Sequence, residues 1–72
     1  MKPIKRRRFI SILEKDFSVR LKREGKGSDT LYCSPNGLAV IPRYEELSGM
    51  LAKKILKELD IGYDEFLRCL RK

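Results

Sequence analysis

The fold is decided by residues 26–42, which read Lys-Gly-Ser-Asp-Thr-Leu-Tyr-Cys-Ser-Pro-Asn-Gly-Leu-Ala-Val-Ile-Pro. Residues 30–34 and 38–41 are expected to form two short strands. Pro35-Asn36-Gly37 between them predicts a tight turn, since proline fixes φ and Asn-Gly accepts left-handed backbone angles. Pro42 ends the second strand, because it cannot donate to a ladder. This part of the chain therefore reads as a hairpin.

A further strand is expected just before this hairpin. From residue 17 the chain alternates apolar and polar residues: Phe17, Val19 and Leu21 against Ser18, Arg20 and Lys22. The two glycines of residues 24–28 break this strand, because glycine allows positive φ angles. Three consecutive strands with short connections predict an antiparallel meander.

A helix is predicted before the strands and two after them. Pro3 suits the first turn of a helix over residues 4–15. A second helix follows the strands, with an apolar stripe made by Leu47, Met50, Leu51, Ile55 and Leu59, widened by Ala52 and Leu56. Asp60-Ile61-Gly62 is expected to stop it, because glycine suits a C-cap. Residues 63–70 form the last helix, with Phe66, Leu67 and Leu70 facing the core.

These elements predict a single α+β domain over residues 1–72, in the order α-β-β-β-α-α. A three-stranded antiparallel sheet is expected, with the helices packed on one face. The length is near the lower limit for a self-sufficient core, and the apolar content of 42% is too high for a disordered chain.

The net charge of +7 is concentrated at one end of the chain. Residues 1–27 carry ten Lys and Arg against three Asp and Glu, whereas residues 28–72 carry seven of each kind. A basic region this local indicates a polyanionic partner, with nucleic acid first. The alternative is a solvated lysine-rich surface.

Several short motifs add to this interpretation through their order and spacing: Arg20, Lys26-Gly27-Ser28, Leu31-Tyr32, Pro35-Asn36-Gly37, Ile41-Pro42, Ile55-Leu56-Lys57, Ile61-Gly62 and Asp64-Glu65-Phe66-Leu67. With them, residues 9–70 resemble the HicA (YcfA-like) family of small messenger-RNA interferase toxins. The resemblance implies a fold like the double-stranded RNA-binding domain, an RNA-facing sheet and glycine loop, and a HicB-like antitoxin partner that blocks the site.

The family's catalytic histidine follows the Gly-Ser pair, and Asp29 stands at that position in a chain without histidine. An exposed aspartate, with a pKa of about 3.9, is a weak general base at neutral pH. The nearby Lys22, Arg23 and Lys26 stabilise the carboxylate further. Asp29 is therefore interpreted as a turn or strand-start residue, and RNA cleavage is expected to be absent or weak. The alternative is an active endoribonuclease whose base has moved to Asp29 or Glu24, or that uses a metal.

RNA binding is expected to survive this change. The candidate phosphate-binding residues are Lys5, Arg6, Arg7, Arg8, Arg20, Lys22 and Lys26, with the loop residues Gly27 and Ser28 and the Lys-Lys-x-x-Lys set of Lys53, Lys54 and Lys57. An ordinary helix surface is the alternative for the last three. Tyr32 and Tyr44 are candidates for stacking on a base, or else half-buried packing residues.

Other classes of function are not supported. Without histidine or clustered cysteine, a transition-metal site lacks ligands, and no cofactor is expected. Cys33 and Cys69 are expected to be reduced thiols in a cytoplasmic protein. No membrane association is expected, because no apolar run approaches a membrane span. A third hypothesis is a protein–protein interaction module derived from the toxin fold.

Overall fold

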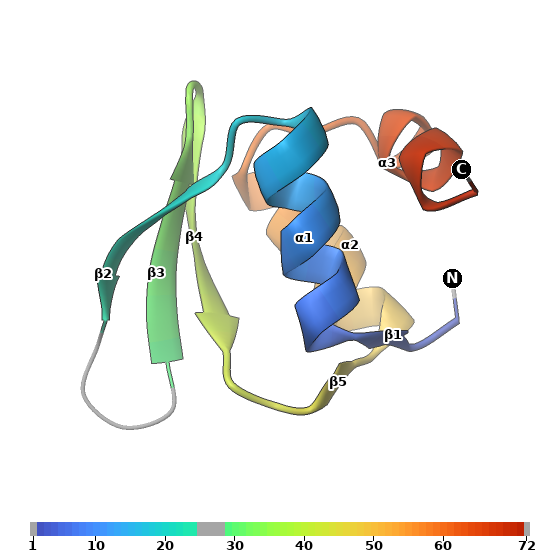
Figure 1. Cartoon of the computed structure of the whole chain (residues 1–72), viewed down its shortest axis with the longest axis horizontal. Coiled ribbons are helices and arrows are strands. Elements are labelled where there is room, and N and C mark those ends of the chain that lie inside the picture. The colour runs from blue at the N-terminus through green and yellow to red at the C-terminus, as the bar shows by residue number, and fades with distance from the viewer. Residues whose placement is uncertain (1, 25–28, 72) are drawn as a thin grey trace.

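The computed structural model of the chain describes residues 2–24 and 29–71. Their elements follow in the order β1 (Ile4–Lys5), α1 (Arg6–Asp16), β2 (Arg20–Glu24), β3 (Asp29–Ser34), β4 (Gly37–Pro42), β5 (Glu46–Leu47), α2 (Gly49–Glu58) and α3 (Tyr63–Leu70). The predicted α+β class is confirmed, with an antiparallel sheet of order β2-β3-β4 and helices beside one of its faces (Figure 1). The predicted strands and helices differ from the observed ones mainly in the residues at which they begin and end.

The two faces of this sheet have different surroundings. On the inner face, Tyr32 of β3 lies opposite Ala39 of β4, and Thr30 lies opposite Ile41. All four side chains are buried, because α1 and α2 lie on this side (Figure 1). Beyond the sheet, Phe9 of α1 packs against Phe66 of α3 with ring centroids 5.1 Å apart. The core therefore lies between the sheet and the helices and continues to α3.

The turn between β3 and β4 lies where the sequence predicts it, but the reason given for Gly37 is wrong. Neither Asn36 nor Gly37 has a positive φ. Gly37 is needed for space, since a Cβ there would overlap the carbonyl oxygen of Glu58 and lie 3.0 Å from the backbone of Leu59. Beside it, the Ser34 hydroxyl donates to the Leu59 carbonyl over 2.6 Å. The hairpin thus rests directly on the end of α2.

Residues with left-handed backbone angles occur instead just after the C-terminal ends of α1 and α2. Ser18 has a φ of 56° after α1, so the strand predicted from residue 17 begins only at Arg20. Asp60 has a φ of 58° after α2, and the next amide, of Ile61, donates to the Leu56 carbonyl. This is a Schellman motif with aspartate where glycine was expected. The predicted C-cap, Gly62, is instead the N-cap of α3.

Two predicted helix starts are wrong, because a small second sheet occupies those positions. Ile4 pairs with Leu47, and Lys5 with Glu46, in an antiparallel β1–β5 pair. Both Ile4 and Leu47 are buried. The helices begin later, at Arg6 and Gly49, so Pro3 is not in a first turn.

The apolar stripe of α2 is also narrower than predicted. Ala52, Ile55 and Leu56 are buried, whereas Met50 is 86% exposed and takes no part in the core. The predicted span of α3, residues 63–70, is confirmed. No helix of the described residues is long and apolar enough to cross a membrane.

The close contact of Gly37 with α2 makes a stability prediction. Gly37→Ala is expected to lower the free energy of unfolding by about 1–3 kcal/mol, because backbone atoms cannot yield to the new methyl group. Asn36→Ala, one residue away and exposed, should change it by less than about 0.5 kcal/mol. Urea unfolding followed by circular dichroism measures both. Equal effects of the two variants would contradict the packing argument.

Candidate nucleic-acid interface

A basic groove of about 860 Å³ runs along α1. Six of its lining side chains are cationic and two are carboxylates. They are joined by a serine, an isoleucine, a tyrosine and a cysteine. The groove is lined by Lys5, Arg6, Arg7, Arg8, Ser11, Ile12, Lys15, Asp16, Arg43, Tyr44, Glu45 and Cys69. This set is called the α1 groove below.

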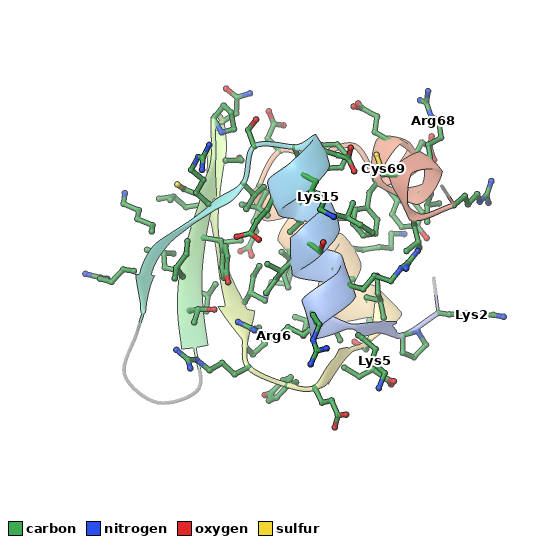
Figure 2. All side chains as sticks on the ribbon, in the orientation of Figure 1. Lys2, Lys5, Arg6, Lys15, Arg68 and Cys69 are labelled. Atoms are coloured by element: carbon green, nitrogen blue, oxygen red, sulfur yellow. The ribbon has the colours of Figure 1, made fainter. Side chains whose placement is uncertain are left out.

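The helical repeat explains why α1 forms one wall of this groove. Arg8, Ser11, Ile12 and Lys15 are three or four residues apart, so they share one face of the helix. Figure 2 shows Lys15 at one end of α1 and Lys5 and Arg6 at the other, with Cys69 of α3 nearby. At a rise of about 1.5 Å per residue, the groove runs about 12 Å from Arg7 to Lys15.

The connection between β4 and β5 also lines the groove and supplies Arg43, Tyr44 and Glu45. Tyr44 is 58% exposed, so its ring is accessible at the groove. Tyr32, the other tyrosine considered for stacking, is buried on the inner face of the sheet. Stacking on a base is therefore excluded for Tyr32 in this structure and open to Tyr44.

Arg6 differs from the other cations of the α1 groove because its guanidinium is bonded inside the protein. Its Nε donates to the Pro42 carbonyl over 2.9 Å, and its Nη2 donates to the Thr30 hydroxyl over 3.0 Å. Thr30 is buried, and its hydroxyl donates in turn to the Ile41 carbonyl over 2.8 Å. Arg6 thus ties α1 to β3 and β4, and much of its hydrogen-bonding capacity is used there.

Two other cations of the groove have weaker internal partners. Lys5 Nζ lies 3.7 Å from a carboxylate oxygen of Glu45, and both side chains are more than half exposed. Such surface pairs contribute little and exchange readily with other partners. Arg8 donates to the Leu70 carbonyl over 3.0 Å at the C-terminal end of α3, where a cation complements the helix dipole.

The three lysines predicted on the second long helix do not line this groove. Lys53, Lys54 and Lys57 line a separate groove with Tyr63. Lys53 Nζ lies 4.8 Å from the centroid of the Tyr63 ring, a cation–π contact. The two grooves share no lining residue.

The remaining candidates lie on or next to the edge strand β2. Arg20 and Lys22 are exposed in that strand, whereas Lys26, Gly27 and Ser28 lie outside the described residues. Asp29 is the first residue of β3, where its backbone lies opposite Pro42. Since the Pro42 carbonyl accepts from Arg6 and Arg43 lines the groove, the position matching the family histidine is near one end of the α1 groove.

The chemistry available in the groove is that of an anion-binding surface. The chain has no imidazole, and no group of three or more Cys, Asp or Glu able to hold a metal ion occurs among the described residues. Cys33 and Cys69 are free thiols. The carboxylates in the groove are Asp16 and Glu45, and Glu45 is beside Lys5.

Comparison of the chain with protein-family models, curated proteins and solved structures finds no match. The structure itself shows a small α+β domain with a basic groove along α1. The resemblance to the HicA family stays a prediction from the sequence.

Sequence reasoning missed Thr30, Ser11 and Arg43 as parts of this region. Thr30 carried a usable signal, since strand alternation puts it on the same face as Tyr32. A hydroxyl on a buried face must find a hydrogen-bond partner. Ser11 carried a signal too, since helical spacing puts it on the same face as Arg8 and Lys15. Arg43 had no comparable signal, because its position depends on how α1 and the β4–β5 connection meet.

Arg6 and Arg7 are neighbours, and comparing their alanine variants tests whether the internal hydrogen bonds of Arg6 stabilise the fold. Arg6→Ala is expected to lower the free energy of unfolding by about 1.5–3 kcal/mol, because it removes charged hydrogen bonds to Pro42 and Thr30. Arg7→Ala removes the same charge from an exposed position and should change it by less than about 0.5 kcal/mol. Urea unfolding of both variants checks this. Similar losses of stability would mean that the bonds of Arg6 contribute nothing particular.

Proposed function

We propose that the chain is an RNA-binding domain of HicA-like type that cleaves RNA weakly or not at all. The observation that carries the proposal is the α1 groove, with six cations against two carboxylates. Phosphate contacts supply most sequence-independent affinity for nucleic acid. A concave, cation-lined surface about 12 Å long is suited to contacting several phosphates of one backbone.

The groove residues divide into three roles under this proposal. Arg7, Arg8 and Lys15 contact phosphates. Arg6 holds α1 in place through Pro42 and Thr30. Tyr44 stacks on an unpaired base at the groove edge, as aromatic side chains do in single-strand binders. Binding thus combines an electrostatic part with one aromatic contact.

Ser11 favours RNA over DNA as the partner. Ser11 lines the α1 groove together with the cations, and a hydroxyl both donates and accepts hydrogen bonds. A 2′-hydroxyl has the same capacity and marks RNA in a shallow minor groove. The RNA is messenger RNA or a structured, double-stranded segment of it, and the proposal includes a cytoplasmic location.

Cleavage is weak or absent in this proposal because the groove lacks a base of suitable strength. A general base works best when its pKa lies near the operating pH, and the chain has no histidine. The alternative function is an active endoribonuclease with a relocated base or a metal. A HicB-like antitoxin that covers the RNA-binding surface belongs to the proposal as a partner.

RNA binding through the α1 groove predicts a strong salt dependence. Affinity for an RNA hairpin with a stem of about 16 base pairs and an unpaired loop should fall linearly on a plot of log K against log salt concentration. Arg7→Ala and Lys15→Ala should each weaken binding at all sequences and reduce the slope by about 0.7–0.9. Fluorescence anisotropy of labelled RNA at several salt concentrations measures both quantities.

Arg68→Ala is the matched control. It removes one positive charge from α3, where Arg68 is exposed and projects away from α1 (Figure 2). Its slope should stay close to that of the unmodified chain. An equal loss for Arg68→Ala would mean that total charge, and not the α1 groove, determines affinity. A salt-independent affinity would contradict the proposal and favour the alternative of a protein–protein interaction module.

The family resemblance predicts the effect of restoring a histidine. Asp29→His should raise the rate of RNA cleavage by about 10²–10⁴-fold, the usual contribution of a positioned general base. Asp29→Asn removes the charge without supplying a base and should stay inactive. Gel analysis of a long RNA, with and without Mg²⁺, gives the rates. If Asp29→His is inactive, the loop register taken from the family is wrong. Magnesium-dependent fragments from the unmodified chain would establish the alternative enzyme.

A further inference from the structure

The outer face of the sheet is a second surface, built differently from the α1 groove. The β2-β3-β4 register places residues in two rows across the three strands, because residues directly opposite one another share a face. One row is Arg20, Cys33 and Leu38, and the other is Arg23, Leu31 and Val40. Each row therefore runs from an arginine on the edge strand to two apolar side chains. These six residues are called the outer-face patch.

No element among the described residues covers this patch. The helices lie on the other side of the sheet (Figure 1), and Leu38 and Val40 are 49% and 50% exposed. Leu31 and Cys33 are half-buried but are not among the residues that pack against the core. Their partial burial therefore comes from neighbours on the outer face. Four adjacent apolar side chains are left open beside two arginines.

The chemistry of the patch argues against RNA as its ligand. Sequence-tolerant RNA binding on a sheet uses aromatic rings that stack on bases. Beside its two arginines, the outer-face patch has only aliphatic side chains and a thiol. Contiguous exposed apolar surface of this kind is typical of protein contacts.

A second copy of this chain is also a poor fit. Each copy carries a net charge of +7, and a stable interface uses about 20–30 residues on each side. The patch offers six residues, of which two are cations. Charge complementarity instead favours a partner segment that is apolar in the middle and acidic at one side.

The geometry points to a docking site for an acidic, amphipathic helix of another protein on the outer-face patch. The two rows lie two residues apart along β3 and β4, a separation of about 7 Å. In β2 they lie three residues apart, because the register shifts between Leu21 and Arg23. Apolar side chains at positions i and i+4 of a helix are about 6 Å apart, so one reaches Leu31 and Val40 and the next reaches Cys33 and Leu38. Glutamates along one side of that stripe meet Arg20 and Arg23. This inference does not rest on RNA binding.

A synthetic helix tests the inference. The probe is a labelled, alanine-based peptide of about 18 residues with leucines at i, i+4 and i+8 and glutamates along one side of that stripe. A second peptide has lysine in place of each glutamate. Amide shifts of the isotope-labelled chain should change at the six patch residues with the glutamate peptide only. The Leu38→Asp, Val40→Asp double variant should lose at least about tenfold in affinity.

Two further variants test whether the peptide binds at the outer-face patch and whether its charge is recognised there. Met50→Asp changes an apolar residue that is 86% exposed on α2 and should leave peptide affinity unchanged. The Arg20→Glu, Arg23→Glu double variant should prefer the lysine peptide. Circular dichroism of each variant verifies that it is folded, as expected for substitutions at exposed positions.

Several outcomes would overturn the inference. They are the absence of glutamate-peptide binding at about 1 mM, equal binding of the lysine peptide, and full binding by the Leu38→Asp, Val40→Asp variant. A sedimentation result showing a dimer that Leu38→Asp dissociates would assign the face to a second copy. RNA-induced shifts at the patch would assign it to RNA.

RNA binding by the α1 groove and peptide binding by the outer-face patch can be tested independently. Arg7→Ala should weaken RNA binding and leave the peptide affinity unchanged, whereas the Leu38→Asp, Val40→Asp variant should weaken peptide binding and leave the RNA affinity unchanged. Competition between RNA and peptide for one site would contradict the separation of the two surfaces.

Discussion

The guanidinium of Arg6 ties the start of α1 to the ends of β3 and β4, and the groove exists because of that connection. Thr30 is the buried polar side chain of the described core, and burial of its hydroxyl requires partners. Arg6 and the Ile41 carbonyl provide them. At the opposite end of the hairpin, Ser34 bonds to the end of α2. The sheet is thus attached to one helix at each end, and the β4–β5 connection contributes Arg43, Tyr44 and Glu45 to the groove.

The sequence predicts the central strands and the last helix well, because those elements carry regular periodicity and strong boundaries. Alternation and turn residues locate the β3–β4 hairpin, and the apolar spacing around Phe66 locates α3. The β1–β5 pair was missed because two residues per strand contain no period. Ile4 and Leu47 read as helix residues since both are apolar, and only the tertiary pairing between them shows otherwise. Local patterns cannot predict a pairing of segments about forty residues apart.

For the candidate site, the sequence predicts the overall charge but not the role of each residue. Counting charges predicts a basic region, and the α1 groove has that character. Counting does not tell which cations face solvent: Arg6 and Arg7 are adjacent and chemically identical, yet one is bonded to Thr30 and the other is exposed. Lys53, predicted to act with the N-terminal cations, lines a different groove. Helical phase and tertiary contacts decide these roles, and neither is contained in the composition.

The separation of the α1 groove from the outer-face patch has an electrostatic consequence. The α1 groove lies on the helix side of the sheet, and the outer-face patch lies on the other side (Figure 1). The Debye length at physiological ionic strength is about 8 Å, so solvent screening weakens the action of exposed charges on one surface upon the other. An acidic segment bound at Arg20 and Arg23 would leave the attraction between the groove and phosphates nearly intact. A chain this small can then hold RNA and a protein partner together, whereas a partner covering the groove itself would have to displace the RNA.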